Sequence, residues 1–136
     1  MIVSCGVIVK NGKILMVKKG GEPFKSTWCP PGGKQKDNEL PEETCKREMK
    51  EEVNLKVKVT KKLIYIDYRE LGKETARFAE KFGLDGIYFY LCEAMTNLNK
   101  IKYNSDASNV KWLSKEEALK EDLTPAARVF LNRVNI

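Results

Sequence analysis

The segment that decides the fold runs from Gly33 to Leu55 and reads GKQKDNELPEETCKREMKEEVNL. Its spacing is G-x5-E-x7-R-E-M-x-E-E-x-N-L, and six glutamates fall between positions 39 and 52. The whole chain of 136 residues carries a formal net charge of +6, so this acidic cluster lies in a basic background. Crowded carboxylates repel one another unless a cation holds them, and a bound divalent metal is the natural explanation.

The middle of this segment predicts a helix over Pro41–Val53. Pro41 suits the first helical position, and Glu42 and Glu43 lie where the helix dipole favours carboxylates. The residues that follow are good helix formers, and Asn54 is suited to a left-handed cap at the C-terminal end.

On such a helix Glu48, Glu51 and Glu52 share one face, because residues three and four apart are neighbours. A neighbouring apolar stripe can bury against a sheet, formed by Cys45, Met49 and Val53. Hard cations such as Mg²⁺ or Mn²⁺ prefer carboxylate oxygens and retain waters that can be activated. The alternative for an isolated acidic face is plain solvation, but the complete 23-residue pattern favours the metal site.

That complete pattern resembles the Nudix box, G-x5-E-x7-R-E-U-x-E-E-x-G-U, in which U is a bulky apolar residue. Eight positions match, and Asn54 stands where the family has Gly. Asn tolerates the left-handed conformation better than other non-glycine residues, so the cap is expected to survive. The likeness extends to residues 28–33 and 109–114. It implies a single Nudix domain over residues 1–136 with an α/β fold, the Nudix-type α/β/α sandwich around a mixed β-sheet.

The resemblance also implies a catalytic site. Glu48 and Glu52 are expected as the principal metal ligands for Mg²⁺, with Mn²⁺ as an alternative. Glu51 is expected to share the metal or to orient the attacking water, and the Gly33 carbonyl to complete the site.

Other residues have supporting roles in this interpretation. Arg47 is expected to pair with Glu39 or with a ligand carboxylate and to hold the loop on the helix. Lys18 and Lys25 are candidates for binding substrate phosphates, although each alone is more typical of a surface lysine. Glu51 is the first candidate for the general base, and three acids outside the box are the alternatives: Glu80, Glu93 and Asp106.

Composition narrows the chemistry further. The chain has no histidine, which excludes Ser-His-Asp and Cys-His nucleophilic sites and histidine zinc ligands. Its four cysteines are scattered without a C-x-x-C pair, so we expect buried thiols and no disulfide framework. No apolar run approaches the roughly 18 residues of a membrane span, and a cytoplasmic location is therefore the expectation.

Outside the acidic segment the chain is strongly basic. The segment 39–52 holds six of the 19 acidic and three of the 25 basic residues, which leaves 13 against 22 elsewhere. A basic surface around an acidic metal site suits a polyphosphate substrate, and a lysine-rich solvated surface is the plain alternative. RNA is also compatible, but no regular interleaving of aromatic and basic residues indicates it.

The remaining elements are consistent with a layered α/β domain. Asn11-Gly12 lies between two β-rich runs and predicts a two-residue hairpin. Further strands are predicted within 55–68, 86–93 and 109–113, and helices after Ser114 and after Thr124. Segment 71–84 has helical spacing, either as an insert over the cleft or as part of the core.

The function predicted is a divalent-metal-dependent pyrophosphohydrolase that cleaves a nucleoside diphosphate linked to another group. A nucleoside triphosphate or a modified nucleotide is the preferred substrate. The alternatives are an ADP-ribose or dinucleoside polyphosphate hydrolase, an RNA 5′-end hydrolase, and a nucleotide-binding module without catalysis. The oligomeric state is left open between monomer and homodimer.

Overall fold

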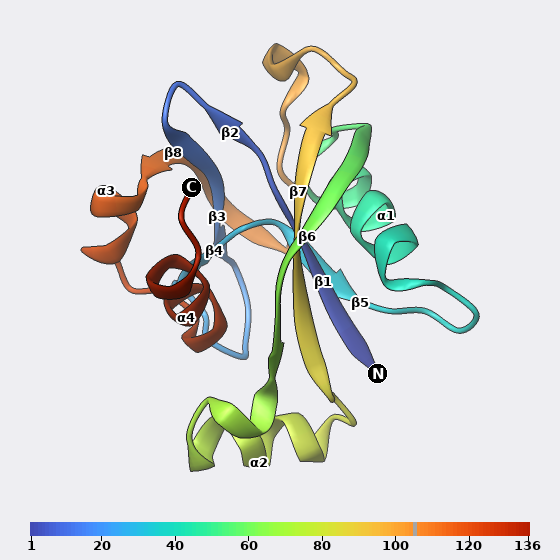
Figure 1. Cartoon of the computed structure of the whole chain (residues 1–136), viewed down its shortest axis with the longest axis vertical. Coiled ribbons are helices and arrows are strands. Elements are labelled where there is room, and N and C mark those ends of the chain that lie inside the picture. The colour runs from blue at the N-terminus through green and yellow to red at the C-terminus, as the bar shows by residue number, and fades with distance from the viewer. Residues whose placement is uncertain (105) are drawn as a thin grey trace.

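The computed structural model describes residues 1–104 and 106–136, which form two β-sheets flanked by helices (Figure 1). Within that range the strands are β1 (Ile2–Val7), β2 (Val9–Lys10), β3 (Lys13–Lys19), β4 (Trp28–Cys29), β5 (Gly32–Lys34), β6 (Val57–Asp67), β7 (Gly86–Ala94) and β8 (Ala107–Ser114). The helices are α1 (Pro41–Val53), α2 (Lys73–Lys81), α3 (Lys115–Leu119) and α4 (Pro125–Arg133), with short 3₁₀ turns η1 (Tyr68–Glu70) and η2 (Leu98–Lys100).

The first sheet is mixed and has the strand order β5-β1-β7-β6. Strands β1 and β7 run parallel, in register from Ile2 opposite Gly86 to Val7 opposite Leu91. The other two pairings of this sheet are antiparallel. The predicted α/β fold around a mixed sheet is therefore confirmed.

The second sheet is built on β3, which pairs antiparallel with β2, β4 and β8. The turn from β2 to β3 is the predicted hairpin, with Asn11 at φ 51° and Gly12 at φ 74°. Two successive positive φ values define the type I′ turn, whose twist matches that of the strands it joins.

Helices cover the sheets from two sides, with α1 on one flank and α3 and α4 on the other (Figure 1). The apolar side of α1 packs in a core that includes Leu15, Val57 and Tyr90. A second core lies under α4, where the rings of Phe89 and Phe130 stack with centroids 4.5 Å apart. These two cores on opposite flanks give the α/β/α layering that was predicted.

Segment 71–84 does contain a helix, α2, which lies at one end of the domain (Figure 1). Its Thr75 and Ala79 are buried, whereas Phe82 is 46% exposed. Part of this helix therefore joins the core, and part of it faces solvent.

The C-terminal helices begin where the capping residues predicted. Ser114 accepts a hydrogen bond from the Glu117 N–H, and the Glu117 carboxylate accepts one from the Ser114 N–H. Thr124 caps α4 by accepting from the Ala127 N–H, with Pro125 as the first helical residue. None of the helices in the described part of the chain is long and apolar enough to cross a membrane.

The four cysteines are all free thiols, as the sequence predicted. Cys5, Cys45 and Cys92 are buried, and Cys29 is partly buried. The sulfur atoms of Cys45 and Cys92 lie 3.7 Å apart between α1 and β7.

Candidate active site

Helix α1 has the bounds that its sequence predicted. The Glu43 carboxylate accepts a hydrogen bond from the Leu40 N–H at the first turn. At the other end Asn54 has φ 60° and ψ 35°, so it takes the left-handed conformation that the family assigns to Gly. Cys45, Met49 and Val53 are completely buried, which fixes the rotation of the helix and turns its glutamates toward the loop before it.

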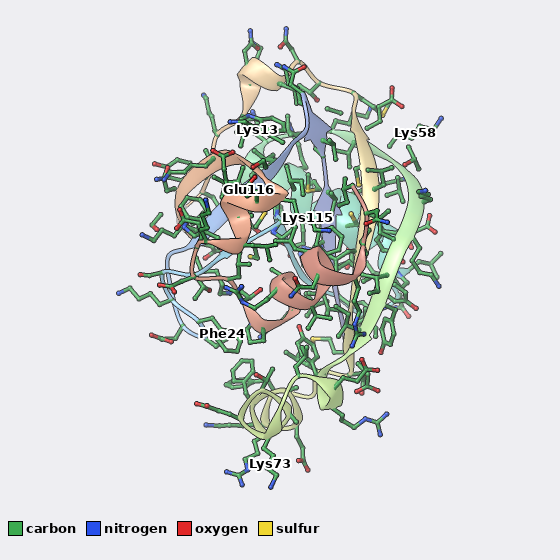
Figure 2. All side chains as sticks on the ribbon, turned by 60° about the vertical axis from the view of Figure 1, so that its left-hand side comes forward. Lys13, Phe24, Lys58, Lys73, Lys115 and Glu116 are labelled. Atoms are coloured by element: carbon green, nitrogen blue, oxygen red, sulfur yellow. The ribbon has the colours of Figure 1, made fainter. Side chains whose placement is uncertain are left out.

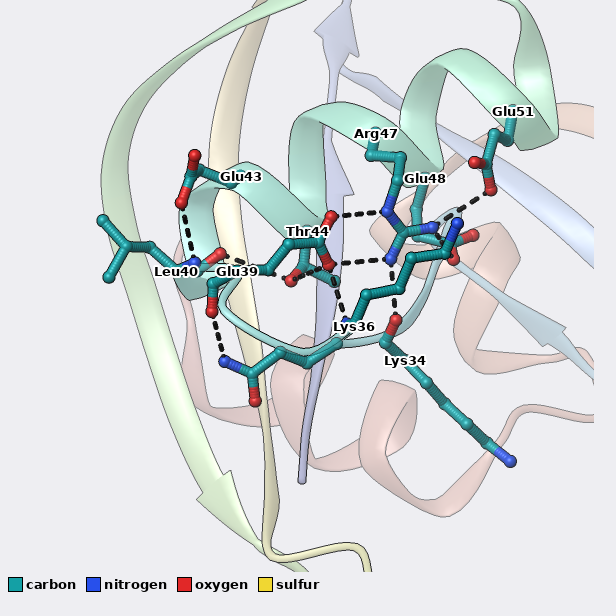
Figure 3. Close-up of polar contacts among 10 residues, drawn as sticks. Lys34, Lys36, Glu39, Leu40, Glu43, Thr44, Arg47, Glu48 and Glu51 are labelled. Atoms are coloured by element: carbon teal, nitrogen blue, oxygen red, sulfur yellow. Dashed lines mark hydrogen bonds and ion pairs between the residues drawn. The ribbon is translucent and has the colours of Figure 1, made fainter.

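Arg47 is the centre of a polar network on this side of α1 (Figure 3). Its guanidinium donates hydrogen bonds to both carboxylate oxygens of Glu39, at 2.6 and 2.9 Å. The same group donates to Glu48 at 2.9 Å, to Glu51 at 3.1 Å and to the Lys34 carbonyl at 2.8 Å. The bidentate bond from Arg47 lowers the pKa of Glu39 to about 2. Arg47 and Glu39 thus fasten the loop to the helix.

Glu48 and Glu52 lie on the side of α1 that meets the backbone of β5. A side chain at Gly33 would collide with the Glu48 carboxyl group, so only glycine leaves room for that carboxylate. The Gly32 N–H points to Glu52 Oε2 at 3.4 Å, a long hydrogen bond. Both carboxylates are therefore held against two consecutive glycines.

The pKa values of both carboxyl groups, Glu48 and Glu52, are raised. Burial raises the pKa of Glu52 to about 7, and the neighbouring charge of Glu48 adds to the shift. Burial also raises the pKa of Glu48, although the hydrogen bond from Arg47 opposes that shift. Paired carboxyl groups that are half-buried and poorly neutralised are typical of a place that binds a cation.

A hard divalent cation fits these residues. One oxygen of Glu48 accepts from Arg47, while Glu48 Oε2 and Glu52 Oε1 receive no hydrogen bond from the described residues. In that same part of the chain, no three Asp, Glu, Cys or His side chains form a group close enough to hold a metal. Such an incomplete set suits Mg²⁺, which commonly binds one or two carboxylates and takes its other ligands from water and substrate phosphates.

The structure separates the candidate bases. The Glu51 side chain is 48% exposed and is held by Arg47, on the opposite side of the guanidinium from Glu39. Asp106 raises the pKa of both Glu48 and Glu52, so its charge acts on the same place. Glu80 is exposed on α2, and Glu93 is exposed on β7 opposite Lys58.

A cavity of about 180 Å³ adjoins the two carboxylates, because Gly32 and Gly33 form part of its wall. Lys19 and Lys34 line it, whereas Lys18 and Lys25 do not. Lys18 is one residue before Lys19 on β3, and successive side chains of a strand point to opposite faces.

The rest of the cavity wall was anticipated from sequence only in segment 71–84, as either an insert over the cleft or part of the core. It includes Cys5, Phe24, Cys29, Tyr68, Leu71, Thr75, Phe78 and Phe89. These residues come from separate strands, loops and helices, and only the tertiary fold brings them together. The helical spacing of Leu71, Thr75 and Phe78 was the one available signal.

Comparison with known proteins identifies the family of the chain. A model of the NUDIX domain matches residues 2–134. The structure of a MutT NUDIX hydrolase from Burkholderia pseudomallei has a TM-score of 0.80 at 24% identity, covering 98% of this chain and 97% of that one. The structure of an ADP-ribose pyrophosphatase from Streptococcus suis has a TM-score of 0.71 at 17% identity, covering 99% and 93%.

One curated relative is more similar over a shorter stretch. It is an ADP-ribose pyrophosphatase from Methanocaldococcus jannaschii, 44% identical over 54 residues, which make up 40% of this chain and 32% of that protein. The match thus spans about a third of the relative's length. The solved structures show the fold, and the domain model covers nearly all residues, including the whole box. Together with the glycine-backed carboxylates of α1, these matches establish that the chain belongs to the Nudix hydrolase family.

Proposed function

We propose that this chain is a divalent-metal-dependent pyrophosphohydrolase that cleaves a nucleoside diphosphate linked to another group, with nucleoside triphosphates or modified nucleotides as preferred substrates. One observation carries the proposal: the Gly32–Gly33 backbone is at once the support of Glu48 and Glu52 and a wall of the cavity. A ligand that fills the cavity therefore has its next groups beside the paired carboxylates.

In this proposal Glu48 and Glu52 hold the cation, and Mg²⁺ is the expected one, with Mn²⁺ as an alternative. When bound, the metal would neutralise charge on the phosphates and lower the pKa of a water molecule. Arg47 keeps Glu48 in position, and the Gly33 carbonyl is the candidate backbone ligand. Lys19 acts on the same region, because its charge opposes the rise in the pKa of Glu52. Its ammonium group is suited to bind a phosphate.

The proton of the attacking water needs an acceptor. We assign that role to Asp106 ahead of Glu51, because the Glu51 carboxylate already accepts a hydrogen bond from Arg47. Asp106 belongs to the loop that follows η2, and the loop is tied to the end of α1 by the hydrogen bond from the Asn104 amide to the Glu51 carbonyl. A general base contributes about 10²- to 10⁴-fold to a rate.

The test is product release from a panel of nucleoside triphosphates, ADP-ribose, dinucleoside polyphosphates and triphosphorylated RNA, with Mg²⁺ or Mn²⁺. Glu52→Gln removes one ligand charge at nearly constant volume. Glu116→Gln is the matched control, because the Glu116 side chain is 85% exposed on α3, on the far flank of the domain. Turnover that needs metal, persists in Glu116→Gln and is lost in Glu52→Gln supports the proposal. Absence of turnover on every compound, with nucleotide binding retained, would identify a binding module instead.

ADP-ribose is the second candidate substrate, and a specific observation favours it. The relative from Methanocaldococcus jannaschii that is named an ADP-ribose pyrophosphatase shares 44% identity over 54 residues. The same panel ranks it: kcat/KM for ADP-ribose above that of every triphosphate would replace the first candidate. A cytoplasmic location and the oligomeric state stay predictions.

A further inference from the structure

The cavity beside the carboxylates is closed by aromatic rings from two distant segments. Phe24 belongs to the loop between β3 and β4, and its side chain lies at the end of the domain next to α2 (Figure 2). Its ring meets that of Phe78 edge to face, with centroids 5.8 Å apart. Phe78 in turn contacts Phe82 at 4.7 Å, and the Lys34 ammonium lies 5.4 Å from the Phe82 ring centre. The loop and α2 therefore form one aromatic wall of the cavity, and the Phe82 ring connects it to the Lys34 ammonium of β5.

The polar groups of this wall have no fixed hydrogen-bonding pattern. Among the described residues that line the cavity there is no Asn, Gln, Asp, Glu or Arg. The hydroxyl groups belong to Tyr68, Thr75 and Thr124; that of Thr124 already accepts from the Ala127 N–H, whereas an uncommitted hydroxyl rotates to donate or to accept as the ligand requires. Side chains that read a base edge with a set order of donors and acceptors are thus missing from the described lining.

Three positions in the backbone of the wall lack a donor as well. Pro23, Pro30 and Pro125 line the cavity, and proline has no N–H group. The carbonyl of Phe24 already accepts hydrogen bonds from the Thr27 N–H and hydroxyl. Of the charged groups, Lys19 acts on Glu52 and suits a phosphate, whereas the Lys34 ammonium lies over the Phe82 ring.

From this inventory we infer that the cavity holds the base of a nucleotide by aromatic and apolar contact, and that the enzyme therefore accepts nucleotides with little regard to the base. The inference rests on the proposed function and adds the breadth of its substrate class. A pocket that works by apolar contact discriminates by only about 10- to 200-fold even when a whole group is added or lost. Pockets built on hydrogen bonds reject the wrong partner by about 10⁴- to 10⁵-fold.

The size of the cavity limits it to one base. At about 180 Å³ it is smaller than the roughly 300–1,000 Å³ of sites that enclose a drug-sized molecule. The second nucleoside of a dinucleoside polyphosphate would thus lie outside this wall and add little to binding.

The experiment measures two quantities on the metal-loaded enzyme. The first is the Kd of α,β-methylene analogues of ATP, GTP, CTP, UTP and ITP, with inorganic tripolyphosphate as the probe that lacks a base. The second is kcat/KM for the five natural triphosphates. We expect both quantities to agree within about tenfold across the five bases, and tripolyphosphate to bind at least tenfold more weakly.

Two variants separate aromatic contact from hydrogen bonding. Phe78→Ala is expected to weaken all five analogues by a similar factor of about ten- to a hundredfold, because stacking on an aromatic ring does not depend on the base. Phe78→Leu keeps the apolar packing and is expected to lie between wild type and Phe78→Ala. Thr75→Val removes a cavity hydroxyl at nearly constant shape and is expected to leave the order of the bases unchanged.

The outcomes distinguish this inference from the proposed function. A spread above a hundredfold among the bases, or a new order in Thr75→Val, overturns the base tolerance even if the enzyme turns over. Equal binding of all analogues by a protein that hydrolyses none of them overturns the proposed function and retains the base tolerance. Tripolyphosphate that binds as tightly as ATP overturns the role of the cavity.

Discussion

The acidic segment contains two regions in which the pKa values of glutamate side chains are shifted in opposite directions. Around Arg47, each glutamate has a cationic partner, and the pKa of Glu39 falls to about 2. One turn further along α1, the Glu52 carboxyl group lies against Gly32 and accepts a single long hydrogen bond from its N–H. The pKa of Glu52 rises to about 7. The protein neutralises its charges where they hold the loop, and it leaves charge for an external cation where the cavity begins.

The largest effect is expected from the region that lacks a partner. Glu52→Gln is predicted to lower kcat by about a thousandfold, because loss of a ligand charge removes several kcal/mol of metal-based stabilisation. Steady-state kinetics at saturating Mg²⁺ measures this. A loss below tenfold would mean that the cation is held elsewhere.

The network region is expected to carry stability. Arg47→Met leaves Glu39 and Glu48 without their common partner and is predicted to reduce the free energy of unfolding by about 3 kcal/mol, as for a buried ion pair that loses one side. Urea unfolding at pH 7 measures the change. Arg69→Met is the matched control, because the Arg69 side chain is 88% exposed in its pair with Asp67, and such exposed pairs contribute little to stability. Equal losses in the two variants would remove the distinction between the regions.

The pH dependence of stability should have opposite signs in the two regions. The folded pKa of Glu52 is raised from 4.5 to about 7, so its contribution is fully present below pH 4.5 and is lost as pH rises through 7. Metal-free Glu52→Gln is therefore predicted to gain about 3 kcal/mol on wild type between pH 4 and pH 8. The pKa of Glu39 is lowered to about 2, so Glu39→Gln should be costly at pH 7 and harmless near pH 2.

Mg²⁺ provides the check on this pH effect. The cation binds the deprotonated carboxylate, so the rise in Tm that it produces should grow as pH increases through 7. In Glu52→Gln the rise should be small and nearly independent of pH. If Mg²⁺ does not change the Tm of the wild-type protein at pH 8, the assignment of Glu52 as a metal ligand is contradicted.

The identity of the general base also distinguishes the two regions. Glu51 belongs to the network around Arg47, whereas Asp106 acts on the paired carboxylates of Glu48 and Glu52. Asp106→Asn is predicted to lower kcat by about a hundredfold, as expected for the loss of a general base. Glu51→Gln should cost less than tenfold in kcat. A larger loss of kcat in Glu51→Gln than in Asp106→Asn would assign the general base to Glu51 instead.

The smallest effect concerns the end of α1. Asn54 holds its left-handed conformation while its side chain donates to the Lys100 carbonyl and accepts from Lys50. Asn54→Ala is predicted to cost about 1–2 kcal/mol, the strain of that conformation for an ordinary residue. Asn54→Gly should lie within about 0.5 kcal/mol of wild type, since the relief of strain offsets the lost contacts. Thermal unfolding of the two variants measures this difference.

Much of this molecule could be predicted from sequence because the signals are local. The bounds of α1 follow from Pro41 and Asn54, and the hairpin follows from Asn11-Gly12. The glutamate pattern likewise indicated which carboxylates share a helical face. What it did not indicate is how Arg47 divides them, because that depends on the exact reach of one long side chain.

Apart from segment 71–84, the cavity wall was beyond sequence reasoning for a different reason. Phe24 and Phe78 are 54 positions apart and meet only after both sheets are assembled. Lys18 and Lys19 are adjacent in the chain, yet β3 turns only Lys19 to the cavity. Such contacts depend on tertiary register, for which a single sequence without repeats offers no local signal.

The parallel pairing of β1 with β7 has a consequence for how the chain assembles. Ile2 lies opposite Gly86, so the centre of the first sheet forms only after a long loop has closed. Until then β1 has only the three residues of β5 beside it. During synthesis from the N-terminus, a nascent chain that ends before Gly86 already contains every residue of the box but lacks β7, the central partner of β1, and β1 is the strand against which α1 packs most closely. The strand beneath the acidic helix therefore gains its central partner only when β7 has been made, and contacts of such high sequence separation are expected to form slowly.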